Sequence, residues 1–131
     1  NRAAAGGWIP RMGDPMERPA WLTAEDLDYY IGEFTRKGFS HGMNYYRNMN
    51  RNWELMAPYA TRTIEMPTLF MAGDRDFVIA RATEEQLMAS MRPSVPNLKK
   101  VVVLTGIGHW IQQEAAGAVN QTLIGFLKDT E

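Results

Sequence analysis

The residues best suited to chemistry are an acid and a histidine, each of which follows a short apolar run. Asp76 comes just after the run 67–72 and Gly73, and His109 follows the run 101–104 and a glycine-containing turn. If the two runs are neighbouring parallel strands, their carboxyl ends meet where open α/β sheets build their sites. A carboxylate there could fix the tautomer of an imidazole and stabilise the imidazolium. The pair would supply two thirds of a nucleophile–His–acid triad.

His109 is one of two histidines in the chain. An unperturbed imidazole titrates at about 6.5, so it could take a proton from water at neutral pH. The alternative is a structural histidine whose hydrogen bonds are satisfied within its turn. The acid expected at the neighbouring strand end favours the functional interpretation. We expect the other histidine, His41, to be exposed to solvent.

Two acids compete to orient the histidine, Asp74 and Asp76. Either could instead shape its own turn, because aspartate side chains often bond nearby backbone groups. We prefer Asp76, because Phe77 and Val78 beside it indicate a buried end. We expect Asp74 to form a surface pair with Arg75.

Tyr46 is a third candidate, within an aromatic-rich segment of the first half of the chain. A phenol is a suitable hydrogen-bond donor to a developing alkoxide. Packing is the more ordinary role of a tyrosine in such a segment, and the residues alone leave both roles open.

The elements that must position the acid and the histidine alternate between strand and helix. We expect a strand at 67–72, a helix over 79–91, a strand at 100–104 and a closing helix over 114–127. This spacing is typical of a parallel β-α-β-α unit. Parallel sheets are buried on both faces, so the unit also implies strands that this chain does not supply.

Helices are expected ahead of this unit, after an irregular lead-in rich in glycine and proline. Thr23 is a suitable N-cap for the first helix and Gly38 a suitable stop, and a second helical segment covers 44–55. Neither segment can form a core alone, so both would rest on another part of the protein as a lid. We therefore divide the chain into a lead-in and lid at 1–62 and a core unit at 63–131.

Bulk composition excludes several classes of protein. The 131 residues suffice for one modest domain, and a net charge of -1 argues against nucleic-acid binding. The absence of cysteine excludes disulfides and thiolate metal sites and fits a cytoplasmic protein. No metal-ligand or nucleotide-binding motif appears, so we expect neither a metal nor a cofactor. No apolar run approaches the roughly 18 to 20 residues of a membrane span.

The lid segment carries a specific resemblance. Gly38-Phe39 followed by 44–53 closely resembles the lid signature of soluble-type epoxide hydrolases, an α/β-hydrolase family. The segment 73–78 is similar to that family's acid turn, and 108–110 followed by Gln113-Glu114 to its histidine loop. The fold class implied is α/β, the C-terminal part of an α/β-hydrolase fold with a parallel β-α-β-α unit preceded by helical lid segments.

The resemblance implies a two-step reaction on a small apolar epoxide. An aspartate nucleophile opens the epoxide to an ester, and a water activated by the histidine and its acid then hydrolyses the ester to a vicinal diol. Carried over by motif, Tyr46 is a lid tyrosine that bonds the epoxide oxygen, Asp76 is the orienting acid and His109 is the base. The residues expected to line the pocket are Met49, Phe77 and Trp110.

The family's aspartate nucleophile has no counterpart among the motifs of this sequence. Nothing ahead of the lid resembles the family's strand-to-helix elbow, and the chain does not begin with methionine. We therefore expect this chain to be inactive alone and to be joined by a missing N-terminal half, as a companion chain or a cleaved part. A homo-oligomer is also compatible with the sequence. The alternatives are another α/β-hydrolase, such as a haloalkane dehalogenase or esterase, and an inactive fragment that only binds a partner.

Overall fold

The computed structural model describes residues 15–79 and 81–130. The chain divides into two compact units after Gly38. The domain boundary expected between residues 62 and 63 stays a prediction. Most of the irregular lead-in, residues 1–14, lies outside the described residues.

The first described helix, α2, spans Ala24–Lys37 and has both of its predicted ends. The Thr23 hydroxyl accepts a hydrogen bond from the Asp26 N–H (3.0 Å), and the Asp26 carboxylate accepts one from the Thr23 N–H (3.1 Å). This reciprocal capping satisfies two backbone donors that the helix leaves unpaired. Gly38 follows the helix with φ 67° and ψ −178°, a backbone conformation that favours glycine.

The helical segment expected at 44–55 is two helices rather than one. Helix α3 spans Ser40–Arg47 and α4 spans Met49–Met56, and a short 3-10 helix, η1, follows at Ala57–Tyr59. The break falls at Asn48, whose side-chain amide donates to a backbone carbonyl one turn earlier (2.8 Å). Such side-chain bonds compete with the helical backbone pattern, which explains why the break falls at an asparagine.

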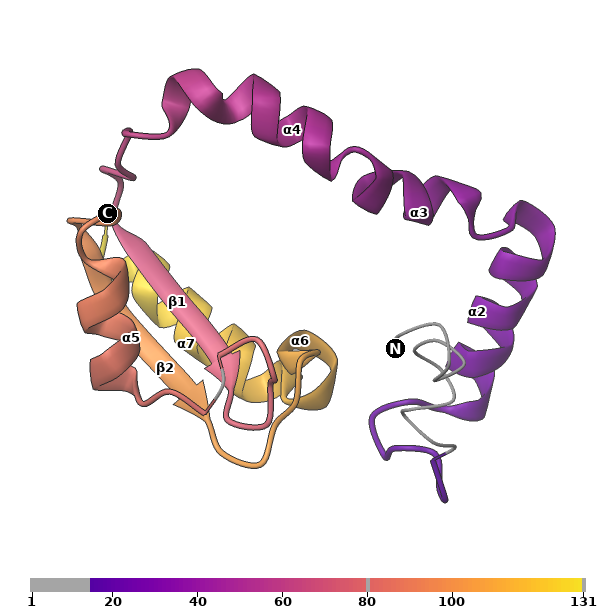
Figure 1. Cartoon of the computed structure of the whole chain (residues 1–131). Helices are drawn as coiled ribbons and strands as arrows, with labels where there is room; N and C mark the ends of the chain where they lie inside the picture. Colours follow the sequence, from indigo (N-terminus) through magenta and orange to yellow (C-terminus); the bar gives the residue numbers. More distant parts are fainter. Residues whose placement is uncertain (1–14, 80, 131) are drawn as a thin grey trace. The chain divides into compact units, whose positions relative to one another are not determined.

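The predicted parallel strand pair is confirmed. Strand β1 spans Thr68–Gly73 and β2 spans Leu98–Leu104, and within the described part of the chain they form a two-stranded parallel sheet (Figure 1). Gly73 pairs with Leu104, the last residue of each strand. The strands therefore end level, and the turns that follow them leave from the same edge of the sheet.

The helix between the strands starts later than predicted. Helix α5 spans Glu84–Met91, whereas the sequence suggested a start at residue 79. The Thr83 hydroxyl accepts from the Gln86 N–H (3.2 Å), and the Gln86 amide oxygen accepts from the Thr83 N–H (2.9 Å). This capping box sets the start of α5 at Thr83. Residues 77–79, which were expected to lead into the helix, form a turn.

The closing helix is also divided. Helix α6 spans Ile111–Glu114 and α7 spans Ala116–Lys128, where one helix over 114–127 was expected. Ala115 lies outside the helical region of backbone space, with φ −140° and ψ 43°, so the helix cannot continue through it.

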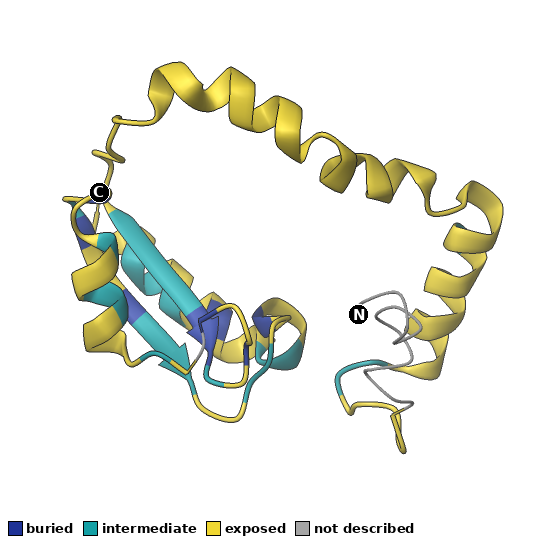
Figure 2. Cartoon of the chain, in the orientation of Figure 1, coloured by how far each residue is buried: buried dark blue, intermediate teal, exposed yellow. Residues whose placement is uncertain are grey.

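Burial is concentrated around the sheet. The core consists of Val95, Leu98 and Val101, against which Phe70 and residues of α5 pack. Figure 2 shows that helices α3 and α4 are exposed along their length. Several large apolar side chains on these helices and on α7, among them Trp53 and Ile124, are more than half exposed. Extended apolar surface of this kind is typical of faces that bind another protein part. Within residues 15–79 and 81–130, no helix is both long and apolar enough to cross a bilayer.

A substitution at Gly73 tests how closely the end of β1 approaches the loop that contains His109. A Cβ atom at this position would overlap the carbonyl oxygens of Ile107 and Gly108. We expect Gly73→Ala to lower the free energy of unfolding by about 1–3 kcal/mol or more, because backbone atoms cannot move aside cheaply. The measurement is urea denaturation of the full-length protein that carries this chain.

Gly117→Ala is the matched control. Gly117 lies in α7, and a Cβ atom added there would have open space around it. Alanine there should be neutral or stabilising by up to about 1 kcal/mol, since it has the higher helix propensity. Equal stability of the Gly73→Ala variant and the parent would refute the close approach.

Candidate active site

The turn after β1 and the loop after β2 are bound to each other. The Arg75 N–H donates to the carbonyl oxygen of Ile107 (2.9 Å), and the Gly106 N–H donates to Oδ1 of Asp74 (2.8 Å). Asp74 was expected to pair with Arg75 at the surface, but its carboxylate instead accepts from the backbone of the opposite turn. Its structural role is to join the two turns.

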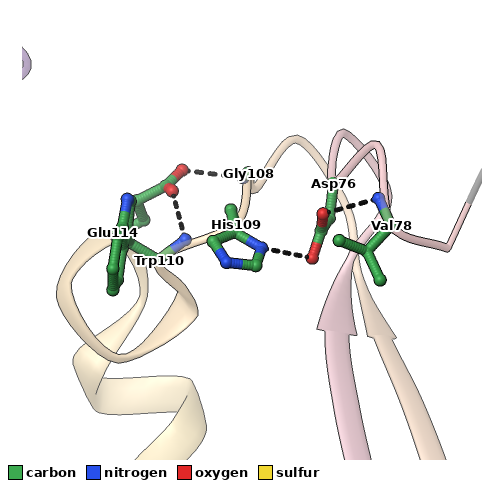
Figure 3. A network of polar contacts seen from close by, with 6 residues as sticks. All are labelled: Asp76, Val78, Gly108, His109, Trp110 and Glu114. Atoms are coloured by element: carbon green, nitrogen blue, oxygen red, sulfur yellow. Dashed lines mark hydrogen bonds and ion pairs between the residues drawn. The ribbon is translucent and has the colours of Figure 1, made fainter. Parts of the chain in front are cut away.

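Asp76 and His109 meet above the ends of the two strands. Oδ2 of Asp76 lies 2.9 Å from Nδ1 of His109, and Oδ1 accepts a hydrogen bond from the Val78 N–H (2.8 Å; Figure 3). Asp76 is 8% exposed. The structure therefore brings together the acid and the histidine that the sequence singled out, with the preferred aspartate as the partner of the imidazole.

The environment of Asp76 keeps its carboxylate charged. Burial raises the pKa of Asp76, but the hydrogen bonds from Val78 and His109 and the charge of His109 together outweigh burial and hold the pKa below its ordinary value of 3.8. An ionised carboxylate only accepts hydrogen bonds, so the shared proton is assigned to Nδ1 of His109. Nε2 is then the basic nitrogen of the imidazole.

Two aromatic side chains contact the imidazole. Phe77 stacks on it with ring centroids 5.9 Å apart, and Trp110 meets it edge-on at 5.3 Å. Both aromatic residues are more than half exposed, and the His109 side chain is 49% exposed. A base in this position is bordered by apolar surface yet accessible to water. The assignment of Phe77 and Trp110 to a substrate pocket stays a prediction.

Glu114 holds the histidine loop, a role that the sequence analysis did not assign. Its Oε2 accepts from the Gly108 N–H (2.7 Å) and its Oε1 from the Trp110 N–H (3.0 Å; Figure 3). These are the two residues that flank His109. An acid in the first turn of a helix, reaching back toward the loop before it, is the sequence signal that could have found this role.

Two of the expected site residues lie on the helices of the lid segment. Tyr46 belongs to α3, is 64% exposed and makes an edge-on contact with Tyr45, with ring centroids 5.8 Å apart. Met49 is the first residue of α4 and is 60% exposed. Their expected roles, as a donor to the epoxide oxygen and as a pocket residue, stay predictions.

The arrangement can activate water. A buried carboxylate that fixes one nitrogen of a half-exposed imidazole leaves the other nitrogen available as a general base. Among the residues that the structure describes, no cluster of three or more His, Cys, Asp or Glu side chains could hold a metal ion. A nucleophile or ester on which the activated water could act must complete the site.

The parallel strands, their helices and the His–acid pair at the carboxyl edge define the C-terminal part of an α/β-hydrolase fold. The crystal structure of epoxide hydrolase A from Mycobacterium thermoresistibile matches with a TM-score of 0.84 and 46% identity, over 95% of this chain and 38% of that one. Potato epoxide hydrolase I matches with a TM-score of 0.76 and 32% identity, over 86% of this chain and 37% of that one.

Sequence comparison gives the same relationship. Epoxide hydrolase A of Mycobacterium tuberculosis is 45% identical over 125 residues, which are 95% of this chain and 38% of the relative. No model of a protein family matches the chain. The chain is homologous to the C-terminal part of the epoxide hydrolases, α/β-hydrolases, and it spans less than two fifths of the length of these relatives. The resemblance inferred from the lid, acid and histidine motifs is thus confirmed.

The lowered pKa of Asp76 predicts a specific pH dependence of stability. Because the folded-state pKa lies below the unfolded one, the ionised carboxylate contributes stability that is fully present above the ordinary value of 3.8 and is lost as the pH falls through the folded pKa. Asp76→Asn cannot ionise. The difference in the free energy of unfolding between parent and Asp76→Asn should therefore shrink as the pH is lowered from about 4.5 toward 3.

Urea denaturation of both full-length proteins across this pH range measures the difference. The same comparison in a His109→Gln background is the control, and the pH dependence should be weaker there because one hydrogen bond to the carboxylate is altered. A difference that grows as the pH falls would contradict a lowered pKa for Asp76.

Proposed function

We propose that the protein that carries this chain is an epoxide hydrolase that opens an epoxide to a vicinal diol through an aspartyl-ester intermediate. The observation that carries the proposal is the 2.9 Å contact between Asp76 and His109 at the edge of the parallel sheet. The 45% identity to a protein named epoxide hydrolase A supports the choice of this reaction among those that a His–acid pair can assist.

In the proposed first step, an aspartate outside this chain attacks a carbon of the epoxide ring. The carbon–oxygen bond breaks, an ester bond to the enzyme forms, and the ring oxygen gains negative charge. Tyr46 would donate its phenolic hydrogen to that oxygen, where a hydrogen-bond donor lowers the barrier most. Its exposed position on α3 supports this role.

In the second step, Nε2 of His109 takes a proton from water, and the resulting hydroxide attacks the ester carbonyl. The ester bond breaks and the leaving oxygen takes the proton of the incoming hydroxide, which regenerates the aspartate as a carboxylate. The imidazolium of His109 returns its proton to the oxygen and phenol pair left negatively charged by the first step, and the neutral diol leaves. Asp76 stabilises the imidazolium that forms and keeps Nδ1 protonated. The half-exposed imidazole and the buried, ionised acid are suited to these two roles.

The apolar rings beside His109 favour a small apolar epoxide, for which Met49, Phe77 and Trp110 would line the pocket. The nucleophile would come from an N-terminal half, as a companion chain or a cleaved part, so this chain alone would be inactive. We also propose a cytoplasmic location, in keeping with the absence of cysteine, and leave a homo-oligomer as an arrangement to test.

Replacing the base should separate the two steps. In the full-length protein, His109→Gln should form the ester with an aryl epoxide at close to the parental rate but hydrolyse it roughly 10²–10⁴-fold more slowly, the usual contribution of a general base. Intact-protein mass spectrometry should then show the protein plus one substrate molecule.

Parallel incubation with a haloalkane tests the alternative activity, that of a haloalkane dehalogenase. Turnover of the haloalkane without turnover of any epoxide would reassign the protein to the dehalogenases. Hydrolysis by His109→Gln at the parental rate would remove His109 from the mechanism.

Replacing the lid phenol should affect the other step. Tyr46→Phe should slow ring opening by about 10²–10³-fold, the cost of losing one donor to a developing oxyanion, and should leave ester hydrolysis close to its parental rate. Stopped-flow single-turnover kinetics measure both rates.

Tyr45→Phe is the matched control, because Tyr45 is the aromatic neighbour of Tyr46 and also exposed. It should change ring opening far less than Tyr46→Phe does. Equally small effects of the two substitutions on ring opening would assign both tyrosines to packing.

A further inference from the structure

We infer that Glu114 is a positioning residue that aims the imidazole of His109 by holding the peptide groups on both sides of it. The role rests on the proposed function for its catalytic consequence, because it acts on the base of the second step. The geometry itself is independent of any reaction.

The contact uses the whole carboxylate. Oε2 accepts from the Gly108 N–H at 2.7 Å and Oε1 from the Trp110 N–H at 3.0 Å, so each oxygen binds one peptide group. Hydrogen bonds to an ionised acceptor are roughly twice as strong as neutral ones. The residue between these two peptide groups is His109. Glu114, in α6, therefore holds the backbone around His109, and Asp76 holds the imidazole ring.

Ordinary helix capping does not account for this arrangement. Helix α6 has four residues and begins at Ile111, and the bond from Trp110 resembles a cap. Gly108, however, lies before the helix and its cap, so the second bond adds nothing to the helix. A Cβ atom on Gly108 would lie 2.9 Å from Oε1 of Glu114, so the glycine makes room for the carboxylate.

The imidazole needs such support because its own surroundings are open. The His109 side chain is 49% exposed, and the two rings that contact it, Phe77 and Trp110, are themselves more than half exposed. The direction of Nε2 is therefore determined by the hydrogen bond to Asp76 and by the position of the His109 backbone. A displacement of about 1 Å at a reacting group can cost on the order of 10²-fold in rate.

The test compares three variants of the full-length protein in single-turnover kinetics with an aryl epoxide. Glu114→Ala removes both acceptors and should slow ester hydrolysis by about 10- to 100-fold while ester formation stays within about twofold of the parent. Glu114→Gln keeps one acceptor oxygen and should fall between Glu114→Ala and the parent. Gln112→Ala, at an exposed position of the same helix, is the control and should leave both rates unchanged.

A second readout does not require the proposed reaction. The proton on Nδ1 of His109 should give a downfield proton NMR signal in the parent, identified by its absence in His109→Gln. The signal should persist in Gln112→Ala and be broadened or lost in Glu114→Ala, because a freer imidazole exchanges that proton faster. If the parent forms no ester with epoxides, the proposed function fails, and this signal still decides the role of Glu114.

Two results would overturn the inference. The first is an unchanged Nδ1 proton signal together with unchanged hydrolysis in Glu114→Ala. The second is an equal loss of ester formation and ester hydrolysis in both Glu114 variants, which would show that the residue supports folding alone. Glu114→Gln keeps the test decisive if the alanine variant does not fold.

Discussion

The site depends on two adjacent parallel strands that end at the same level. Gly73 pairs with Leu104 at the end of the sheet, so the turns that follow start side by side although Asp76 and His109 are 33 residues apart. Backbone hydrogen bonds and the Asp74 carboxylate then join one turn to the other. The contact between Asp76 and His109 thus depends on the register of the two strands, which sets where the two turns begin.

Burial and exposure are divided between the members of the pair. Asp76 is buried and has a hydrogen bond at each oxygen, which offsets the cost of removing a charge from water. His109 is half exposed and bordered by aromatic rings, so its second nitrogen can meet solvent or substrate. A fixed acid and an accessible base are the combination that general base catalysis requires.

The exposed apolar surface and the length comparison point to the same organisation. Several large apolar side chains on α3, α4 and α7 are more than half exposed, and the chain covers 38% of the length of epoxide hydrolase A of Mycobacterium tuberculosis. In a complete α/β fold, further strands and helices cover such surfaces. Under the proposed function, the nucleophile would belong to that remainder, and this chain would supply the acid and the base of the site.

Several features could be predicted from the sequence because they depend on local residue patterns. The apolar runs indicated both strands, Thr23 and Gly38 indicated the ends of α2, and the lid, acid and histidine motifs indicated the family. Each of these signals lies within a few neighbouring residues. Asp76 was preferred over Asp74 because the apolar Phe77 and Val78 beside it indicated a buried end. Asp76 is indeed buried, but Phe77 and Val78 are 71% and 63% exposed, so the choice was right and the reason for it was wrong.

Other features were decided only by the tertiary structure. The Asp74 carboxylate binds Gly106, which is 32 residues away, and Glu114 binds the peptide groups on either side of His109. The helix breaks at Asn48 and Ala115 also went unpredicted. Residue pattern shows that an acid is present but not which backbone N–H it will face, because that depends on how the loops fold over the sheet edge. The sequence by itself determined which groups are available, and the tertiary structure determined which of them hold the histidine in place.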